Sequence, residues 1–199
     1  NGIKADLEIV PMQGWERDML WDETGLPWVL TSPHIPQPIT AIFYPASGII
    51  GELNTISIGV GYTLPFQAFL ATWIDAIKLC DHLNALQLPG WTFRPIYAKP
   101  YYGADQGKSA QGVQPYITDY SKANLSLLQF YVVEAIEKLF PTHNPIRNAK
   151  ESRLNMFDKV CGSSKIRKTF LDSGCKVSSI EEMWTAPADE FRQRRKPYL

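Results

Sequence analysis

Net charge, cysteine and long apolar runs are all scarce in this 199-residue chain. Lys and Arg total 20 and Asp and Glu total 20, so the formal net charge at pH 7 is zero. Nucleic acids and anionic membranes attract proteins through clustered positive charge, so this balance argues against both as partners. The basic cluster Arg192, Arg194, Arg195 and Lys196 is expected to complement the dipole of a C-terminal helix.

The three cysteines, Cys80, Cys161 and Cys175, are an odd number with no Cys-x-x-Cys pair. They argue against a disulfide framework and against a zinc site, and we expect them to be small thiols in or near the core. No stretch approaches the roughly 20 consecutive apolar residues of a transmembrane helix. Sequence motifs for nucleotide phosphates, a hydrolase serine or a paired-histidine metal site are missing too. The sequence therefore predicts no cofactor and no metal.

The beginning of the chain divides into two segments. Ile3–Met12 alternates apolar and polar residues, which predicts a β-strand. We interpret it as the last strand of an earlier sheet, because nothing before it could pair with it. From Gly14 to Pro38 no hydrophobic period survives, and the segment is rich in Trp, Gly, Pro and charged residues. This pattern predicts a long ordered loop, and such loops in compact domains are often functional.

The remainder predicts strands mixed with helices and no regular β-α-β repeat, which indicates an α+β fold: a small mixed sheet with packed helices. Pro38 fits the first turn of a helix and Pro45 should kink that helix. Gly59 and Gly61 indicate bends or close backbone approach, and Ser126 is expected to cap the clearest helix. Helices are expected at 39–53, 74–88, 125–140, 151–161, 164–173 and 179–195, and strands at 56–70, 92–99 and 112–118.

Five segments, taken in order, resemble the signature of one enzyme family. They are WERDMLWDETGLPWVLTSPHIPQPITAIFYPASGIIGELN, SIGVGYTLPF, LPGWTFRPIYAKP, QGVQPYITD and the ending FRQRRKPYL. On these motifs the chain resembles the C-terminal half of the NamZ family of exo-β-N-acetylmuramidases. The resemblance runs from about Trp15 to Leu199, and several linked motifs in the right order are far more specific than any one of them.

The resemblance implies removal of β-1,4-linked N-acetylmuramic acid from the non-reducing ends of peptidoglycan fragments. It implies a two-domain protein, in which the active cleft lies between a Rossmann-like N-terminal domain and a smaller C-terminal domain. Residues 1–14 would then end the preceding domain or link to it, residues 15–199 would form the C-terminal domain, and the N-terminal domain would be absent. The expected partners are peptidoglycan-derived muramyl saccharides and that missing domain, in a periplasmic or otherwise extracytoplasmic location.

Two positions depart from the family pattern. Val60 stands where the resemblance expects the arginine of a GRGT motif, and Tyr120 stands where an arginine commonly follows VTD. The first arginine could hold a lactyl carboxylate or organise the cleft. Losing two cations weakens the case for an anionic sugar unless the charge comes from elsewhere in the chain.

Glu52 is the candidate catalytic residue. Glycoside hydrolysis usually needs one carboxylic acid to protonate the leaving oxygen and a second carboxylate to activate water or to attack directly. Glu52 lies in the ELNT stretch, which is similar to the family's EGTN motif, and a glycine-bearing segment follows it. The alternative is that Glu52 pins the adjacent loop through hydrogen bonds while the acid and base lie wholly in the missing domain.

The residues after Glu52 are candidates for substrate binding. Asn54, Thr55 and Ser57 offer neutral hydrogen-bonding groups to sugar hydroxyls or an acetamido group, although such residues also commonly form turns. Arg94, in the family-like FRP motif, could grip a carboxylate through two parallel hydrogen bonds. The alternative for Arg94 is a buried structural salt bridge.

Three further candidates lie at the edges of predicted elements. Asp119 follows an apolar strand, so its carboxylate could point into a cleft or could cap the helix that starts near Asn124. Trp28 and His34 lie in the Pro-rich loop, which could form one wall of the cleft, although a lone histidine in such a loop is commonly a surface residue. Two function classes therefore stay open: half of an exo-muramidase, or a non-catalytic cell-wall glycan-binding or stabilising module.

Overall fold

The computed structural model describes residues 4–198, which form six α-helices and one small β-sheet, so the fold is α+β as the sequence predicts. The strands follow the order β1-β3-β2 and both pairings are antiparallel, so the sheet is antiparallel rather than mixed. The loop that joins the last two strands, residues 99–109, is too short for a crossover connection, so these two strands pair antiparallel. The strands are β1 (Phe69–Ala71), β2 (Trp91–Ala98) and β3 (Ala110–Ile117).

Each of the six segments expected to be helical does form a helix, with its ends displaced by a few residues. None of these helices, within the residues described, is long and apolar enough to cross a membrane. The helices are α1 (Pro38–Gly51), α2 (Ala76–Ala85), α3 (Leu125–Leu139), α4 (Glu151–Val160), α5 (Ser164–Asp172) and α6 (Glu181–Arg195). Short 3₁₀ helices lie at Trp21–Thr24, Pro141–His143, Val177–Ser179 and Lys196–Tyr198.

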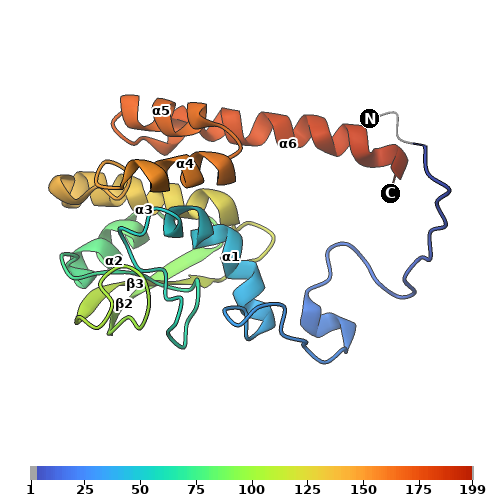
Figure 1. Ribbon diagram of the computed structural model, residues 1–199, viewed down its shortest axis with the longest axis horizontal. Helices are drawn as coiled ribbons and strands as arrows, with labels where there is room; N and C mark the ends of the chain where they lie inside the picture. Colours follow the sequence, from blue (N-terminus) through green and yellow to red (C-terminus); the bar gives the residue numbers. More distant parts are fainter. Residues whose placement is uncertain (1–3, 199) are drawn as a thin grey trace.

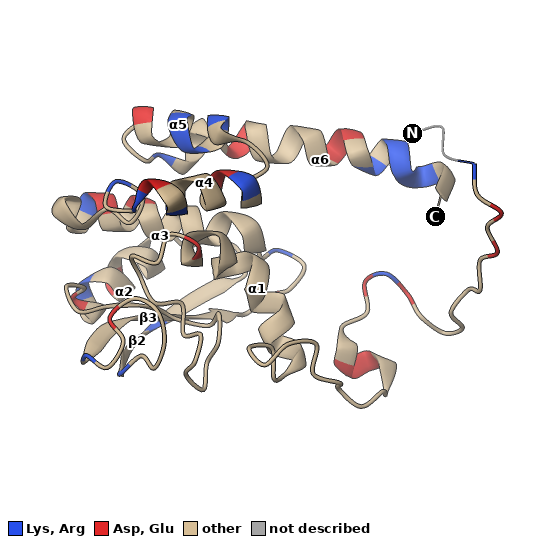
Figure 2. Cartoon of the chain, viewed as in Figure 1, with Lys and Arg blue, Asp and Glu red and all other residues tan. Residues whose placement is uncertain are grey.

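The elements are arranged in layers (Figure 1). The sheet and α2 lie on one side, α3 runs through the middle, and α4, α5 and α6 lie beyond α3. The first described residues run away from this body as an exposed chain. The helices differ in charge: α1 carries no charged residue, whereas α4, α5 and α6 carry charges of both signs (Figure 2).

Phe130 of α3 joins the layers into one core. Its ring contacts Phe157 of α4, Phe170 of α5 and Trp184 of α6 edge-on, with ring centroids 6.2, 5.3 and 5.2 Å apart. Edge-to-face pairs of this kind add about 0.5–1.5 kcal/mol each beyond the area they bury. One aromatic side chain therefore anchors all three outer helices.

A side-chain amide of α3 supports α1 at its internal proline. Pro45 has no N–H and cannot complete the helical ladder. Gln129, which is only 1% exposed, donates from Nε2 to the carbonyl oxygen of Pro45 (2.9 Å) and accepts at Oε1 from the backbone N–H of Ile50 (3.0 Å). These bonds fix the second half of α1 against α3.

Two features of local structure differ from the sequence predictions. Residues 4–12 form no strand, and Ile3, the first residue of the predicted strand, lies outside the described residues. An alternating pattern forms a strand only beside a pairing edge, and no residue between 4 and 198 pairs with this segment. Ser126 does not cap α3, because Asn124 accepts from the backbone N–H of Leu127 (3.2 Å) and is the N-cap.

The segment 56–70 is only partly β-structure. It contains an isolated bridge between Ser57 and Leu70 and the start of β1, and turns occupy the remainder. Gly59 and Gly61 both have φ +80°, as their expected role in bends requires. Of the basic residues at the C-terminus, Arg192, Arg194 and Arg195 lie in the last turn of α6, where cations complement the helix dipole, and Lys196 is its C-cap.

Replacing Gln129 with leucine tests the support of α1. The variant Gln129→Leu should lower the free energy of unfolding by about 2–3 kcal/mol, because it removes two hydrogen bonds between buried groups of α1 and α3. Urea unfolding monitored by circular dichroism measures this change. Gln193→Leu, at an exposed position of α6, is the control and should change stability by less than about 0.5 kcal/mol. Equal stabilities of the two variants would contradict this role of Gln129.

Cys161 provides a test of packing around α4. The three cysteines are free, and burial, followed by the nearby Asp158 carboxylate, raises the pKa of the Cys161 thiol to about 12. Because the thiolate is the reactive form, alkylation of Cys161 in the folded protein should accelerate about tenfold per pH unit from about pH 8 to about pH 10. Mass spectrometry after timed iodoacetamide treatment measures the rate, with the unfolded chain as control. A rate that levels off below about pH 9 would show an ordinary exposed thiol.

Candidate functional site

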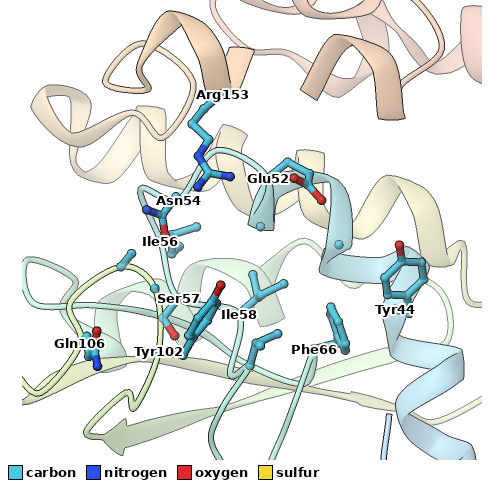
Figure 3. Close-up of a pocket in the computed structure, with 15 residues that line it drawn as sticks. Tyr44, Glu52, Asn54, Ile56, Ser57, Ile58, Phe66, Tyr102, Gln106 and Arg153 are labelled. Carbon is cyan, nitrogen blue, oxygen red and sulfur yellow. The ribbon is translucent and has the colours of Figure 1, made fainter. Parts of the chain in front are cut away.

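A cleft of about 520 Å³ opens between the end of α1, the segment that follows it and the loop between β2 and β3 (Figure 3). Its lining combines aromatic and aliphatic side chains with a few polar ones. Clefts of this composition commonly bind small molecules, with the apolar surface giving contact area and the polar groups fixing orientation. The polar side chains are Glu52, Asn54, Ser57, Gln106 and Arg153, and the aromatic ones are Tyr44, Phe66 and Tyr102.

Small residues let the cleft walls approach one another. A Cβ on Gly51 would lie 2.4 Å from Cδ1 of Ile58, so glycine lets the Ile58 side chain pack directly on the end of α1. Gly61 has φ +80°, and a Cβ there would lie 2.8 Å from Cβ of Tyr102. The two glycines therefore bring the segment after α1 and the β2–β3 loop together.

Asp105 holds the β2–β3 loop in place. Its carboxylate accepts hydrogen bonds from the backbone N–H and the hydroxyl of Thr72, at 2.9 and 3.3 Å. It also pairs with Lys108 at 3.3 Å. This anchor fixes the part of the loop that presents Tyr102 and Gln106 to the cleft.

Glu52 is half-buried at the C-cap of α1 and lines the cleft. Among residues 4–198, no side chain or backbone group donates a hydrogen bond to its carboxylate, and no cation lies within 4.0 Å of it, so it does not pin the adjacent loop. The C-terminal end of a helix carries partial negative charge, which makes an anion unfavourable there. Stabilisation of α1 therefore does not explain why a glutamate stands at position 52.

Asn54 and Ser57 lie in the same cleft as Glu52, but Thr55 does not. Asn54 has φ 53°, and its Oδ1 lies against Gly103 of the opposite wall, where a Cβ would approach to 3.1 Å. The Ser57 hydroxyl accepts from the N–H of Gly59 at 3.4 Å. Thr55 instead donates to the carbonyl oxygen of Pro145 at 2.9 Å, which fastens the turn to the segment before α4.

Arg94 is on β2, outside the cleft lining. Its Nε donates to Gln114 Oε1 (2.9 Å) and to the Tyr116 hydroxyl (2.7 Å), both on β3. Its guanidinium also lies over the Tyr116 ring. The expected buried salt bridge does not form, because Arg94 is exposed and has no carboxylate within 4.0 Å in the described part of the chain.

Asp119 is also outside the cleft lining. It accepts from the hydroxyl (2.6 Å) and the backbone N–H (2.9 Å) of Ser121 and pairs with Lys122 (2.9 Å). The Ser121 hydroxyl bond, followed by Lys122, lowers the pKa of Asp119 to about 2. Its side chain orders the turn before α3 without capping that helix, whose N-cap is Asn124.

Trp28 and His34 belong to different environments although they share one loop. Trp28 packs edge-on against Trp21, with ring centroids 5.3 Å apart, and lines a second pocket of about 320 Å³ beside α1. Tyr120 lines that second pocket, whereas Val60 lines the main cleft. The His34 ring lies 6.1 Å from the ring of Tyr102, at the edge of the main cleft.

Sequence reasoning missed several residues that line the cleft. Tyr44 lies inside a helix and Arg153 is far along the chain, so no local motif marks either of them. Tyr102 and Gln106 lie in a hairpin loop. The sequence signal for that loop is the run Tyr101–Tyr102–Gly103, in which two aromatic residues adjoin a glycine. In the structure both tyrosines are exposed.

Comparison with known proteins identifies the family to which this chain belongs. The sequence model described as exo-β-N-acetylmuramidase NamZ, C-terminal, matches residues 42–199, and the corresponding N-terminal model matches residues 1–39. The two models meet near the start of α1.

Two relatives agree with this match. A Bacillus subtilis (strain 168) protein named peptidoglycan β-N-acetylmuramidase NamZ is 36% identical over 197 residues, which are 99% of this chain and 46% of the relative. The crystal structure of a DUF1343 family protein from Bacteroides fragilis NCTC 9343 superposes with a TM-score of 0.90 at 46% identity, covering 94% of this chain and 48% of that one. The chain thus spans about half the length of these relatives, and it belongs to the NamZ family of exo-β-N-acetylmuramidases.

Proposed function

We propose that this chain contributes one wall of the active cleft of an exo-acting glycoside hydrolase. The substrate would be a peptidoglycan fragment, from whose non-reducing end the enzyme removes β-1,4-linked N-acetylmuramic acid. The other wall would come from a Rossmann-like domain that precedes this chain, with residues 1–14 at the junction. Membership of the NamZ family supports the activity, and the cleft supports the position of the active site on this chain.

One observation carries the proposal: Glu52 is a half-buried carboxylate, without a partner among the described residues, in a cleft that also presents aromatic rings. The faces of sugar rings pack on aromatic side chains, and neutral groups such as those of Asn54 and Gln106 can hydrogen-bond sugar hydroxyls. A carboxylic acid at such a position can protonate the oxygen of a leaving group. Arg94, Asp119, Thr55 and Trp28 lie outside the cleft lining, so in this proposal they take no part in binding.

A second candidate function is a non-catalytic module that binds or stabilises cell-wall glycan. It is favoured by the count of carboxylates, because Glu52 is the one acidic side chain among the described residues that line the cleft. Hydrolysis usually needs two carboxyl groups. In the first proposal the partner domain supplies the second, whereas in this alternative that domain supplies both.

Peptidoglycan as substrate leads us to propose a periplasmic or otherwise extracytoplasmic location. Fractionation of cells that make the full protein, followed by immunoblotting, measures it. Recovery in the cytoplasmic fraction would contradict the proposal.

The variant Glu52→Gln separates the two candidate functions. In this chain joined to its upstream domain, removal of the carboxyl group should lower kcat by about 10²–10⁴-fold, because proton transfer to the leaving oxygen is lost. The KM should change little, since the amide retains the shape of the side chain. Release of N-acetylmuramic acid from the disaccharide MurNAc–GlcNAc measures both values.

Glu182→Gln, at an exposed position of α6, is the matched control and should leave kcat unchanged. An unchanged kcat in Glu52→Gln would instead assign this chain to the accessory class. The same two variants assayed for ligand binding show whether a loss of turnover reflects chemistry or folding.

A further inference from the structure

We propose that Arg153 is the cation that recognises the lactyl carboxylate of N-acetylmuramic acid in this cleft, a role that rests on the proposed function. Arg153 comes from α4, and it points down from that helix toward Asn54 and Glu52 (Figure 3). Its position in the sequence gives no hint of this placement. Only the packing of α4 beside the end of α1 brings it to the cleft.

Within residues 4–198 the guanidinium of Arg153 has no partner. Arg147, Arg167, Arg192 and Arg194 pair with carboxylates, and Arg17 and Arg94 lie over aromatic rings. Arg195 also lacks such a contact, but it lies in the last turn of α6, outside the cleft lining. Among residues 4–198, Arg153 makes no side-chain hydrogen bond, no ion pair within 4.0 Å and no ring contact. It is exposed, so its five N–H donors are available to a ligand.

The helix that carries Arg153 does not benefit from it. Arg153 lies in the first turn of α4, where the helix dipole presents partial positive charge. A cation there is unfavourable, and favourable positions for it are in the last turn. Arg153 and Glu52 thus each stand at the helix end that suits them least, and both face the same cleft.

The charge pattern fits the chemistry of the sugar. N-Acetylmuramic acid is N-acetylglucosamine that carries a lactyl ether on O3, and the ether bears one carboxylate. A guanidinium can bind that carboxylate through two parallel hydrogen bonds. Val60, which lines the same cleft, carries no charge, so the positive charge comes from Arg153.

The cleft needs such a cation for an anionic ligand to enter. Glu52 lies in the same space and would repel a second carboxylate. Arg153 is the only Lys or Arg among the described residues lining the cleft. Its charge offsets that repulsion. Because Arg153 forms no ion pair with Glu52, its guanidinium is available to bind the carboxylate of the ligand.

The test measures the affinity of this chain, joined to its upstream domain, for two probes, the methyl β-glycosides of N-acetylmuramic acid and of N-acetylglucosamine, by chemical-shift titration. The unchanged chain should prefer the muramic glycoside. Arg153→Gln should weaken binding of that glycoside by about threefold to fivefold, the effect of losing one charge-assisted pair at an exposed site. It should leave binding of the glucosamine glycoside within about twofold.

Lys159→Gln is the matched control, because it removes the same charge from an exposed position of α4 outside the cleft lining. It should keep the preference. An Arg153→Gln variant that keeps the full preference overturns the role of Arg153 while leaving the proposed function intact. Failure of the unchanged chain to bind either glycoside counts against the proposed function itself, and the role of Arg153 falls with it. Identical amide spectra away from the cleft establish that each variant is folded.

Discussion

The cleft depends on how the end of α1 is held against α3. Pro45 interrupts the hydrogen bonding of α1, and the amide of Gln129 bonds to the backbone of the half of the helix that follows, at Pro45 and Ile50. A hydrogen-bonded buried amide is stabilising, but losing one partner would leave polar groups unpaired. The position of Glu52, one residue beyond α1, therefore depends on a contact made across the core.

The other walls are attached to that helix end by short-range constraints. Gly51 admits the Ile58 side chain, Gly61 admits Tyr102, and Asp105 fastens the β2–β3 loop to Thr72. These contacts order irregular backbone without lengthening the sheet. The result is a cleft whose chemistry comes from loops and helix ends, while the sheet and α3 supply rigidity, as is common for binding sites.

The helices were predictable because their signals are local: periodicity, an N-terminal Pro38, and breaks at Pro89 and Pro141. Residues 4–12 show the limit, since alternation describes a strand only if a partner is present. The same limit applies to the site. Glu52, Asn54 and Ser57 were accessible from one family-like motif, but Arg153 and Tyr102 reach the cleft through tertiary packing that no local pattern encodes. Arg94 lies on β2 and Asp119 lies just after β3, as the sequence predicts, but neither side chain lines the cleft.

The central claim is that this cleft, rather than the pocket beside Trp28 or the surface around Arg94, receives the terminal sugar. Titration of the ¹⁵N-labelled Glu52→Gln variant of this chain, joined to its upstream domain, with the disaccharide MurNAc–GlcNAc tests it most directly. The account predicts that the largest amide shifts fall on residues 51–61 and 102–106, with a smaller set at the start of α4. Shifts concentrated on residues 19–28 or on β2, or no shifts at all, would contradict it.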